Sequence, residues 1–268
     1  MGPAAGERPP VDPAFGWLDD GWGPGLRCIP LSAAAQHVFT VRQPELPGAD
    51  APVRDARWTA AATALGVHAG LFRVTQVHGR TVRVVRPGDD AQARPEADAL
   101  VSDVAGAGLL VQVADCVPIL VVDPVVGAAA AVHAGWRGTC ARVTRAAVEA
   151  LTAEYGCRPA DMMAAIGPSI GPDDYEVGDA VLEAFADAGH AGTTRWFRRT
   201  GERGALHLDL WEANLDQLTA CGIAPGAVHV SRLSTAPNPV WLDSYRRDGP
   251  AAGRMAGIVR VPAAAPRG

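Results

Sequence analysis

The chain has 268 residues, of which 48% are hydrophobic, and a formal net charge of −5 with no lysine in the sequence. This length and apolar content suit one large domain or two small ones and argue against wholesale disorder. The acidic balance gives no general attraction for nucleic acid. The missing lysine excludes Schiff-base chemistry and phosphate loops of the lysine-bearing type.

The five cysteines are widely spaced and odd in number, which argues against a disulfide framework and favours a reducing compartment. No stretch approaches the ~18 continuous apolar residues that a membrane helix requires, and the first residues lack the pattern of a signal peptide. We therefore expect a cytoplasmic protein with no membrane partner, either a monomer or a homodimer.

Proline and glycine mark the ends of the expected domain. Residues 1–14 and 262–268 are rich in these residues and are expected to form disordered tails. Residues 15–261 are expected to form a single catalytic domain. Within it, the polar, proline-bearing stretch 43–54 is expected to be a surface loop.

The predicted elements follow from apolar runs bounded by turn residues and from amphipathic spacing. In chain order they are a helix at 57–65, strands at 71–77, 81–85, 109–113, 119–123 and 128–133, a helix at 139–155, a strand at 164–166, a helix at 179–188, a strand at 206–208, a helix at 210–221, and strands at 228–230 and 258–261. Asp209 and Glu212 have capping-box spacing, and Gly156 and Gly222 are stop signals. This mixture predicts an α/β (mixed α+β) fold, a single layered domain of mixed sheets flanked by helices.

Three segments place a metal-capable side chain where a predicted strand ends, with Gly or Pro close by. These side chains are His78, Cys116 and His133. Their separations of 38 residues (78 to 116) and 17 residues (116 to 133) are too long for a finger-type zinc clip. They suit a catalytic zinc site with three protein ligands from distant strands and an open fourth position. Copper would bind the same ligands.

Each of these residues also has a simpler interpretation. His78 alone is more often a structural or surface histidine, and Cys116 between apolar runs is more often an inert buried thiol. Cys116 with His133 is also compatible with a metal-free catalytic pair. Spacing alone leaves these alternatives open.

The segment after His133 predicts an anion site. Gly135 and Gly138 allow a tight turn, and Thr139 is expected to open the long helix, whose N-terminus attracts anions. Arg137 beside it is suited to clamp a phosphate or carboxylate in bidentate fashion.

At these residues the chain resembles the multicopper polyphenol oxidase (laccase-domain) family, also called the peptidoglycan editing factor family. The matching motifs are TQVHG (75–79), ADALVSD (97–103), VADCVPILVVDP (113–124), AVHAGWRGT (131–139), IGPSIGPDDYEVG (166–178), SYRRDG (244–249) and GRMAGI (253–258). The resemblance runs from His37 to Val261. It implies a layered α/β fold similar to that of bacterial toxin cysteine hydrolases, with zinc ligands at His78, Cys116 and His133.

The resemblance implies a purine nucleoside phosphorylase, acting with phosphate on adenosine, inosine, guanosine and methylthioadenosine, that also deaminates adenosine. Some members are described as copper-dependent phenol oxidases, and bacterial members are linked to the correction of cell-wall precursors. The chain departs from the family pattern in two places. Residues 43–54 lack the usual paired glycines and asparagine, and Ser234-Thr235 replaces a Cys-Thr pair. These changes leave the metal ligands untouched but affect expected substrate contacts.

The candidate catalytic residues are Cys116, His133 and Asp115. Asp115 is either a proton carrier or a residue that orients a histidine ligand. The candidate substrate or phosphate contacts are Arg42, Gln76, Arg137, Ser169, Tyr175, Arg246 and Arg247. Among them, the arginines suit phosphate and the tyrosine suits stacking on a base.

Three rival functions are compatible with the same residues. A copper phenol oxidase of the multicopper type needs several metal centres, whereas only three ligand candidates cluster among seven histidines and five cysteines. A metal-free Cys116–His133 hydrolase would cleave an amide in a cell-wall precursor. A non-catalytic zinc-binding module would hold the metal in a closed site.

Overall fold

The computed structural model describes residues 7–42, 51–191, 193–200 and 204–265. The predicted tails and the predicted loop at 43–54 lie partly outside these ranges, so the division into one domain and two tails stays a prediction. Within the described ranges, no helix has the length and apolar character needed to cross a membrane.

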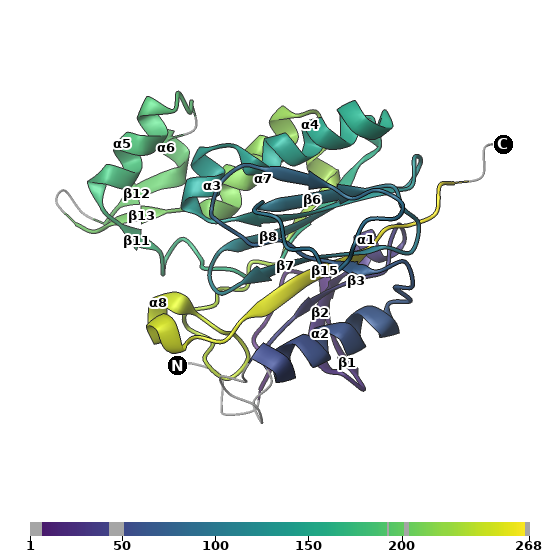
Figure 1. The fold of residues 1–268 in the computed structure, drawn as a ribbon. Helices are drawn as coiled ribbons and strands as arrows, with labels where there is room; N and C mark the ends of the chain where they lie inside the picture. The colour runs from purple at the N-terminus through teal and green to yellow at the C-terminus, as the bar shows by residue number, and fades with distance from the viewer. Residues whose placement is uncertain (1–6, 43–50, 192, 201–203, 266–268) are drawn as a thin grey trace.

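Two six-stranded mixed sheets stack face to face at the centre of the molecule (Figure 1). The first has the order β1-β2-β3-β15-β7-β4 and the second the order β14-β10-β8-β9-β6-β5. The strands of the first sheet, in that order, are Phe15–Asp20, Gly23–Cys28, His37–Thr40, Met255–Arg260, Gly108–Val113 and Leu71–Phe72. Those of the second are Val228–Val230, Met163–Ile166, Val117–Asp123, Ala128–Ala134, Ala99–Ser102 and Val82–Val84.

Helices cover the outer faces of both sheets (Figure 1). Helix α2 (Ala51–Ala64) packs on the first sheet. The second sheet is covered by α3 (Trp136–Cys140), α4 (Val143–Tyr155) and α7 (Leu210–Ala220). The remaining α-helices are α1 (Ile29–Ser32), α5 (Asp179–Asp187), α6 (Thr193–Trp196) and α8 (Tyr245–Asp248), and the short 3₁₀ turns are Pro159–Asp161, Pro225–Ala227 and Gly249–Ala251.

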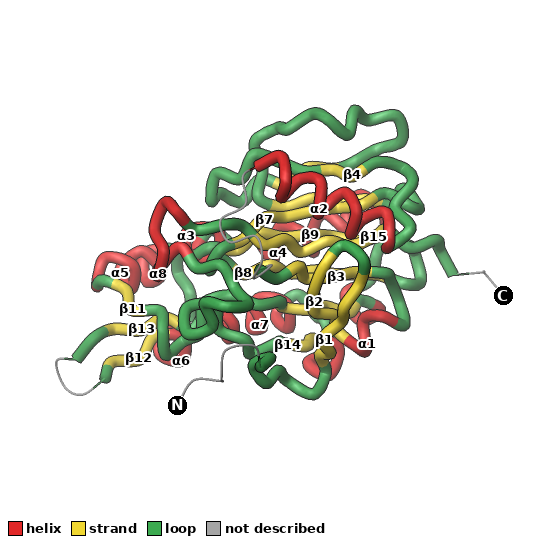
Figure 2. The backbone as a smooth tube through the Cα atoms, turned by 90° about the horizontal axis from the view of Figure 1, so that it is seen from below, coloured by secondary structure: helices red, strands yellow, loops and turns green. Residues whose placement is uncertain are grey.

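A small third sheet lies to one side, next to α5 and α6 (Figure 2). Its strands, in the order β11-β13-β12, are Glu176–Val177, Leu206–Leu208 and Phe197–Arg199. Together with the two stacked sheets and their helices, this confirms the predicted class, a mixed α/β fold of layered sheets flanked by helices.

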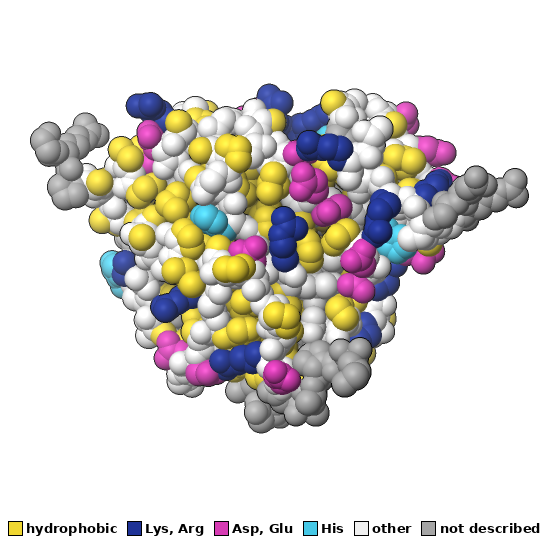
Figure 3. Space-filling view, turned by 180° about the vertical axis from the view of Figure 1, so that it is seen from behind, with side chains coloured by type: hydrophobic (Ala, Val, Ile, Leu, Met, Phe, Trp, Pro, Cys, Tyr) yellow, Lys and Arg dark blue, Asp and Glu magenta, His cyan; other side chains and the backbone are white. Residues whose placement is uncertain are grey.

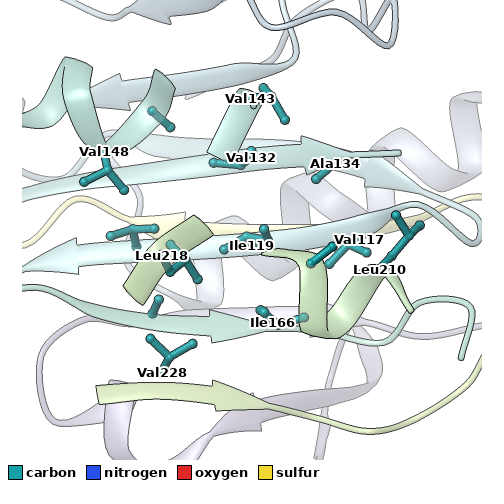
Figure 4. Packing of buried hydrophobic residues seen from close by; sticks show 14 of the residues in the cluster. Val117, Ile119, Val132, Ala134, Val143, Val148, Ile166, Leu210, Leu218 and Val228 are labelled. Carbon is teal, nitrogen blue, oxygen red and sulfur yellow. The ribbon is translucent and has the colours of Figure 1, made fainter. Parts of the chain in front are cut away.

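The core follows from the alternation of side chains along the strands. On β8, Ile119 points into the core beneath α4 and α7 (Figure 4), whereas Leu120 and Val122 point between the two sheets toward Leu109. Strands β8 and β9 are therefore buried along their whole length, which explains why their sequences read as continuous apolar runs. A third cluster around Trp58 joins α2 to the first sheet.

The predicted helix at 139–155 is wrong at its start. The structure has two helices there, separated at Arg142, which adopts a left-handed conformation with φ of 62°. A continuous helix would need the carbonyl of Thr139 as the acceptor for the N–H of Val143. That carbonyl instead accepts hydrogen bonds from the N–H of Arg142 at 3.0 Å and from the side chain of Gln217 on α7 at 2.8 Å. The anion site expected where Thr139 opens a long helix is therefore not formed in that way.

Other boundaries also differ from the prediction, most of all at the start of α2 and at the predicted strand 71–77. Residues 51–54, expected in a loop, form the first turn of α2, while 43–50 lie outside the described residues. Pro52 is compatible with this turn because the first N–H groups of a helix have no partner within it. The predicted strand at 71–77 ends at Phe72, and Thr75 forms only an isolated bridge.

Charged side chains of both signs are interspersed on the face seen from behind (Figure 3). Exposed ion pairs of the described surface include Arg86 with Glu154 and Arg145 with Glu149. Pairs of this kind contribute little to stability. This face therefore presents no extended patch of a single sign.

Candidate metal centre

His78, Cys116 and His133 come together from three separate segments. His78 lies in the loop after β4, Cys116 lies in the turn between β7 and β8, and His133 lies near the end of β9. Their ligand atoms are all within 4.8 Å of one another. His133 is buried, Cys116 is half-buried and His78 is exposed. The cluster is therefore anchored in the second sheet through His133 and open to solvent at His78.

Asp98, which directly precedes β6, positions two of these residues. Its buried carboxylate accepts hydrogen bonds from the backbone N–H groups of His78 (2.9 Å) and Gly79 (2.6 Å). It also accepts from Nδ1 of His133 at 2.9 Å, which leaves the other ring nitrogen available as a ligand. Burial favours the neutral acid, but the hydrogen bonds from His133, Gly79 and His78 outweigh it and lower the pKa of Asp98.

The backbone of His78 is left-handed, with φ of 61°. Such a conformation is uncommon outside glycine and persists where the surroundings determine it. Here the two hydrogen bonds to Asp98 fix the turn. These bonds hold His78 in its left-handed conformation, which places its side chain beside Cys116 and His133.

Asp115 has a second left-handed backbone, with φ of 83°. One of its carboxylate oxygens accepts from Thr235 Oγ1 at 2.5 Å and the other from the N–H of Arg246 at 2.6 Å. Asp115 thus joins the turn that carries Cys116 to the first turn of α8. The carboxylate that is hydrogen-bonded to a histidine of the cluster is that of Asp98.

The thiol and imidazole of the cluster favour each other's charged forms. Burial opposes both charges, but the attraction between Cys116 and His133 lowers the pKa of Cys116 and raises the pKa of His133. A hydrogen bond to Asp98 also raises the pKa of His133. The site is therefore suited to present Cys116 as a thiolate, the form that binds a metal.

Gly135 is packed against two members of the cluster. A Cβ atom at this position would lie 2.8 Å from Sγ of Cys116 and 3.1 Å from Cδ2 of His78. Contacts under 3.0 Å require something to move. The absence of a side chain at Gly135 therefore allows α3 to begin directly beside the ligands.

The donor set fits a zinc ion. Zinc–ligand bonds are about 2.0–2.3 Å long, so ligand atoms within 4.8 Å of one another lie near the spacing that a shared ion requires. Two imidazole nitrogens and a thiolate match the borderline softness of zinc and suit copper as well. Three protein ligands with a solvent-exposed side match the pattern of a catalytic rather than a structural zinc site.

A cleft of about 970 Å³ opens over the cluster. One part of its wall is aromatic and apolar. This part consists of Trp136, Ile170, Tyr175 and Leu210. The cleft is also lined by arginines, namely Arg94, Arg137, Arg246 and Arg254. The combination suits a ligand with a planar apolar part and an anionic part.

Four of the predicted contacts line this cleft, namely Gln76, Arg137, Tyr175 and Arg246. The guanidinium of Arg137 lies 4.4 Å from the ring centroid of Trp136, and that of Arg246 lies 5.1 Å from the ring centroid of Tyr175. Burial raises the pKa of Tyr175 to about 12, so its phenol stays neutral. These stacked pairs place two positive charges on the aromatic wall.

Several predicted contacts are held by the protein itself. Gln76 lines the cleft, but its amide both donates to and accepts from the backbone of Gln112 at 2.8 Å. Ser169 is buried and accepts a hydrogen bond of 2.7 Å from a tryptophan Nε1. Arg247 donates to three backbone carbonyls and pairs with the following aspartate. Arg42 donates to a backbone carbonyl at 2.8 Å. The latter three do not line the cleft.

Ser234, which replaces a cysteine of the family pattern, supports the loop that precedes Tyr175. Its hydroxyl donates to Asp174 at 2.6 Å and accepts from the N–H of Gly171 at 2.9 Å. The substitution therefore places a hydrogen-bonding group behind one wall of the cleft.

Sequence reasoning missed Asp98, Arg94 and Arg254. Asp98 is the second residue of the motif ADALVSD, and Arg254 lies in GRMAGI, so both fall within segments that match the family. The sequence alone indicates no role for Asp98, because a single aspartate before a strand is also typical of a turn. Arg94 lies in a loop that carries no motif.

Known proteins resemble the chain over most of its length. The family model described as multi-copper polyphenol oxidoreductase laccase matches residues 48–262. A protein of Bacteroides thetaiotaomicron named purine nucleoside phosphorylase is 42% identical over 158 residues, 59% of this chain and 58% of that protein. A protein of an unknown prokaryotic organism named adenosine deaminase RL5 is 39% identical over 174 residues, 64% of this chain and 66% of that protein. The chain thus matches less than two thirds of the length of each of these two relatives.

A solved structure shares the fold across almost the whole chain. YlmD from Geobacillus stearothermophilus superposes with a TM-score of 0.81 at 30% identity, covering 93% of this chain and 99% of that one. The stacked sheets and their flanking helices are therefore a shared architecture.

Proposed function

Because the chain belongs to the multi-copper polyphenol oxidoreductase laccase family, we propose that it is a zinc-dependent enzyme that phosphorolyses purine nucleosides and deaminates adenosine. The names of two relatives, a purine nucleoside phosphorylase and an adenosine deaminase, support this reaction class. The observation that carries the proposal is the His78–Cys116–His133 cluster beneath a cleft with an aromatic wall and arginines. Expected substrates are adenosine, inosine, guanosine and methylthioadenosine.

In this proposal His78, Cys116 and His133 hold the zinc ion, which supplies Lewis-acid chemistry when bound. Asp98 keeps the Nδ1–H of His133 engaged and so directs the other ring nitrogen toward the cluster. Gly135 leaves the space beside the cluster free of a side chain.

The walls of the cleft would bind the two substrates. Tyr175 and Trp136 offer ring faces for stacking on the purine. Arg137 and Arg246, stacked on those rings, would hold phosphate through charged hydrogen bonds, close to the anomeric carbon of the sugar. Phosphorolysis depends on this positioning, since phosphate must reach the anomeric carbon as the base leaves.

Asp115 stays our candidate for carrying a proton during deamination. Its carboxylate already accepts hydrogen bonds from Thr235 and from the backbone of Arg246. Proton transfer would therefore compete with the bonds that hold α8.

The test uses protein whose zinc content has been measured. It is incubated with adenosine, with and without phosphate, and adenine, inosine and hypoxanthine are separated by chromatography. We expect adenine to form only when phosphate is present. Inosine should form even when phosphate is absent. Cys116→Ser should abolish zinc binding and lower both rates by at least 100-fold, as expected for loss of a ligand.

Cys221→Ser is the matched control, because Cys221 is half-buried at the end of α7 and lies outside the cleft. It should retain zinc and both activities. Zinc-loaded protein that forms neither product would contradict the proposal. So would phenol oxidation under air by the copper-loaded protein in the absence of any nucleoside turnover.

A further inference from the structure

The cleft contains more positive charge than one phosphate requires. Arg94, Arg137, Arg246 and Arg254 all line it, and within the described ranges none of them forms an ion pair with a carboxylate. The chain as a whole is acidic, with a net charge of −5. Four guanidinium groups facing one cavity therefore indicate a ligand with more than one anionic group.

The four arginines belong to two separate parts of the wall. Arg137 and Arg246 stack on the aromatic rings. Arg94 and Arg254 come from the side formed by the first sheet. The carbonyl of Arg94 accepts a hydrogen bond of 3.0 Å from Thr75 Oγ1. Arg254 directly precedes β15, whose first residue pairs with the last residue of β7.

Arg94 and Arg254 are anchored in the same way. Nη1 of Arg94 donates to the carbonyls of Ala91 (2.7 Å) and Ala93 (3.0 Å). Nη1 of Arg254 donates to the carbonyls of Ala252 (2.9 Å) and Gly253 (2.8 Å). In the described part of the chain, the Nη2 group of each has no protein acceptor. Each guanidinium is thus fixed by one nitrogen and keeps donors for a ligand.

The charge on Arg94 is only partly compensated, since Asp55 and Asp90 attract it without forming an ion pair with it. Burial and the neighbouring Arg73 both lower the pKa of Arg94. Arg73 itself is paired with Asp55 at 2.8 and 3.1 Å, so that carboxylate is already engaged. An anionic ligand at Arg94 would relieve this unfavourable charge.

We propose that Arg94 and Arg254 bind a phosphate carried by the substrate itself, so that the enzyme prefers nucleoside 5′-monophosphates to nucleosides. This inference rests on the proposed function. The aromatic wall would take the base, and Arg137 with Arg246 would take inorganic phosphate. Arg94 and Arg254 on the other side would then take the 5′-phosphate, the kind of group that guanidinium forks bind best. A cleft of about 970 Å³ is large enough for all three parts.

The reaction balances with these two reactants. The bond between C1′ and N9 breaks, and its electron pair leaves with the base, which takes up a proton. An oxygen of inorganic phosphate forms the new bond to C1′. Adenosine 5′-monophosphate and phosphate would therefore give adenine and ribose 1,5-bisphosphate.

The test compares AMP, adenosine and inorganic phosphate on zinc-loaded protein, by calorimetric titration and by product chromatography. We expect AMP to bind at least ten times more tightly than adenosine in the wild type. The double variant Arg94→Gln, Arg254→Gln should lower the AMP-to-adenosine ratio of kcat/KM at least tenfold. Arg86→Gln, which removes a surface charge paired with Glu154, is the control and should leave that ratio unchanged.

Each other outcome is decisive. Equal affinity of the wild type for AMP and adenosine overturns the proposal. So does a double variant that loses affinity for AMP and for adenosine to the same extent. If the double variant instead loses affinity for inorganic phosphate alone, the subsite holds the free reactant and the proposal is wrong. If AMP binding depends on Arg94 and Arg254 but neither compound is turned over, the subsite stands and the proposed function fails.

Discussion

Gly135 and Gly178 form a natural pair for testing how tightly the ligand side chains His78, Cys116 and His133 are packed. Both are N-cap residues with extended backbones, at φ of −73° and −82°. A Cβ at Gly135 would meet Cys116 Sγ at 2.8 Å, whereas nothing lies within 4 Å of one at Gly178. Gly135→Ala should therefore lower zinc affinity at least tenfold by displacing a ligand, and Gly178→Ala should not. Equal zinc affinities in chelator competition would refute this packing argument.

Asp98 acts in a different way, since it positions His78 and His133 by hydrogen bonds without being a ligand itself. Asp98→Asn keeps the shape but replaces one acceptor oxygen with a donor, which would face either the N–H groups of His78 and His133 or that of Gly79. We expect zinc affinity to fall about 10–100-fold, the usual effect of losing a partner of a metal ligand. Asp103→Asn, an exposed aspartate of the same motif, is the control. Wild-type affinity in Asp98→Asn would show that the histidines need no such support.

The short helix α8 depends on contacts with the turn that carries Cys116. Thr235→Val removes the hydroxyl that donates to Asp115 and leaves a buried carboxylate oxygen without that partner. We expect the free energy of unfolding to fall by about 1–3 kcal/mol. KM should rise more than kcat falls, because Arg246 on α8 shifts while the ligands stay in place.

Thr219→Val is the comparison for this variant, since within the described residues Thr219 Oγ1 donates to carbonyls of its own helix alone. It should change neither KM nor zinc content. A loss of zinc in Thr235→Val, with KM unchanged, would mean that Thr235 supports the metal ligand rather than α8.

The elements that the sequence predicts well are those whose pattern is local. Strands β8 and β9 are continuous apolar runs because both of their faces are covered, and turn residues mark their ends. Strands β1 and β2 escaped prediction because their sequences, FGWLDD and GPGLRC, are rich in glycine, aspartate and proline. They are stabilised by pairing with each other and with β3, which no local pattern encodes.

The same distinction applies to the site. The segments of His78, Cys116 and His133 could be identified because an apolar run stops at each of them beside Gly or Pro. Spacing alone leaves their convergence open, because it depends on how the sheets stack, and only the resemblance to the family implies it. Asp98 connects His78 to His133 by hydrogen bonds between residues 20 and 35 positions apart, and such contacts leave no periodic signal.

Stability of the whole molecule should depend on pH through a histidine far from the cluster in sequence. His37 is buried on β3, where its Nε2 accepts from the N–H of Cys28 at 3.0 Å and its Nδ1 donates to the carbonyl of Ala35 at 3.0 Å. The ring must therefore be neutral, since a proton on Nε2 would face another N–H. Burial accordingly lowers the pKa of His37 from 6.5 to about 4.

A histidine whose pKa is lower in the folded than in the unfolded state makes its full contribution to stability at pH values above its unfolded-state pKa. That contribution is lost as pH falls from about 6.5 to about 4, since the unfolded chain takes up the proton first. The loss amounts to at most about 3 kcal/mol for a shift of this size. In urea unfolding at stepped pH, His37→Asn should have a shallower slope than wild type across this window, while the exposed His68→Asn should match wild type. Each variant lacks one histidine of the wild type, so a change in slope that is specific to His37→Asn isolates His37. Identical slopes would mean that the pKa of His37 is the same in the folded and the unfolded state.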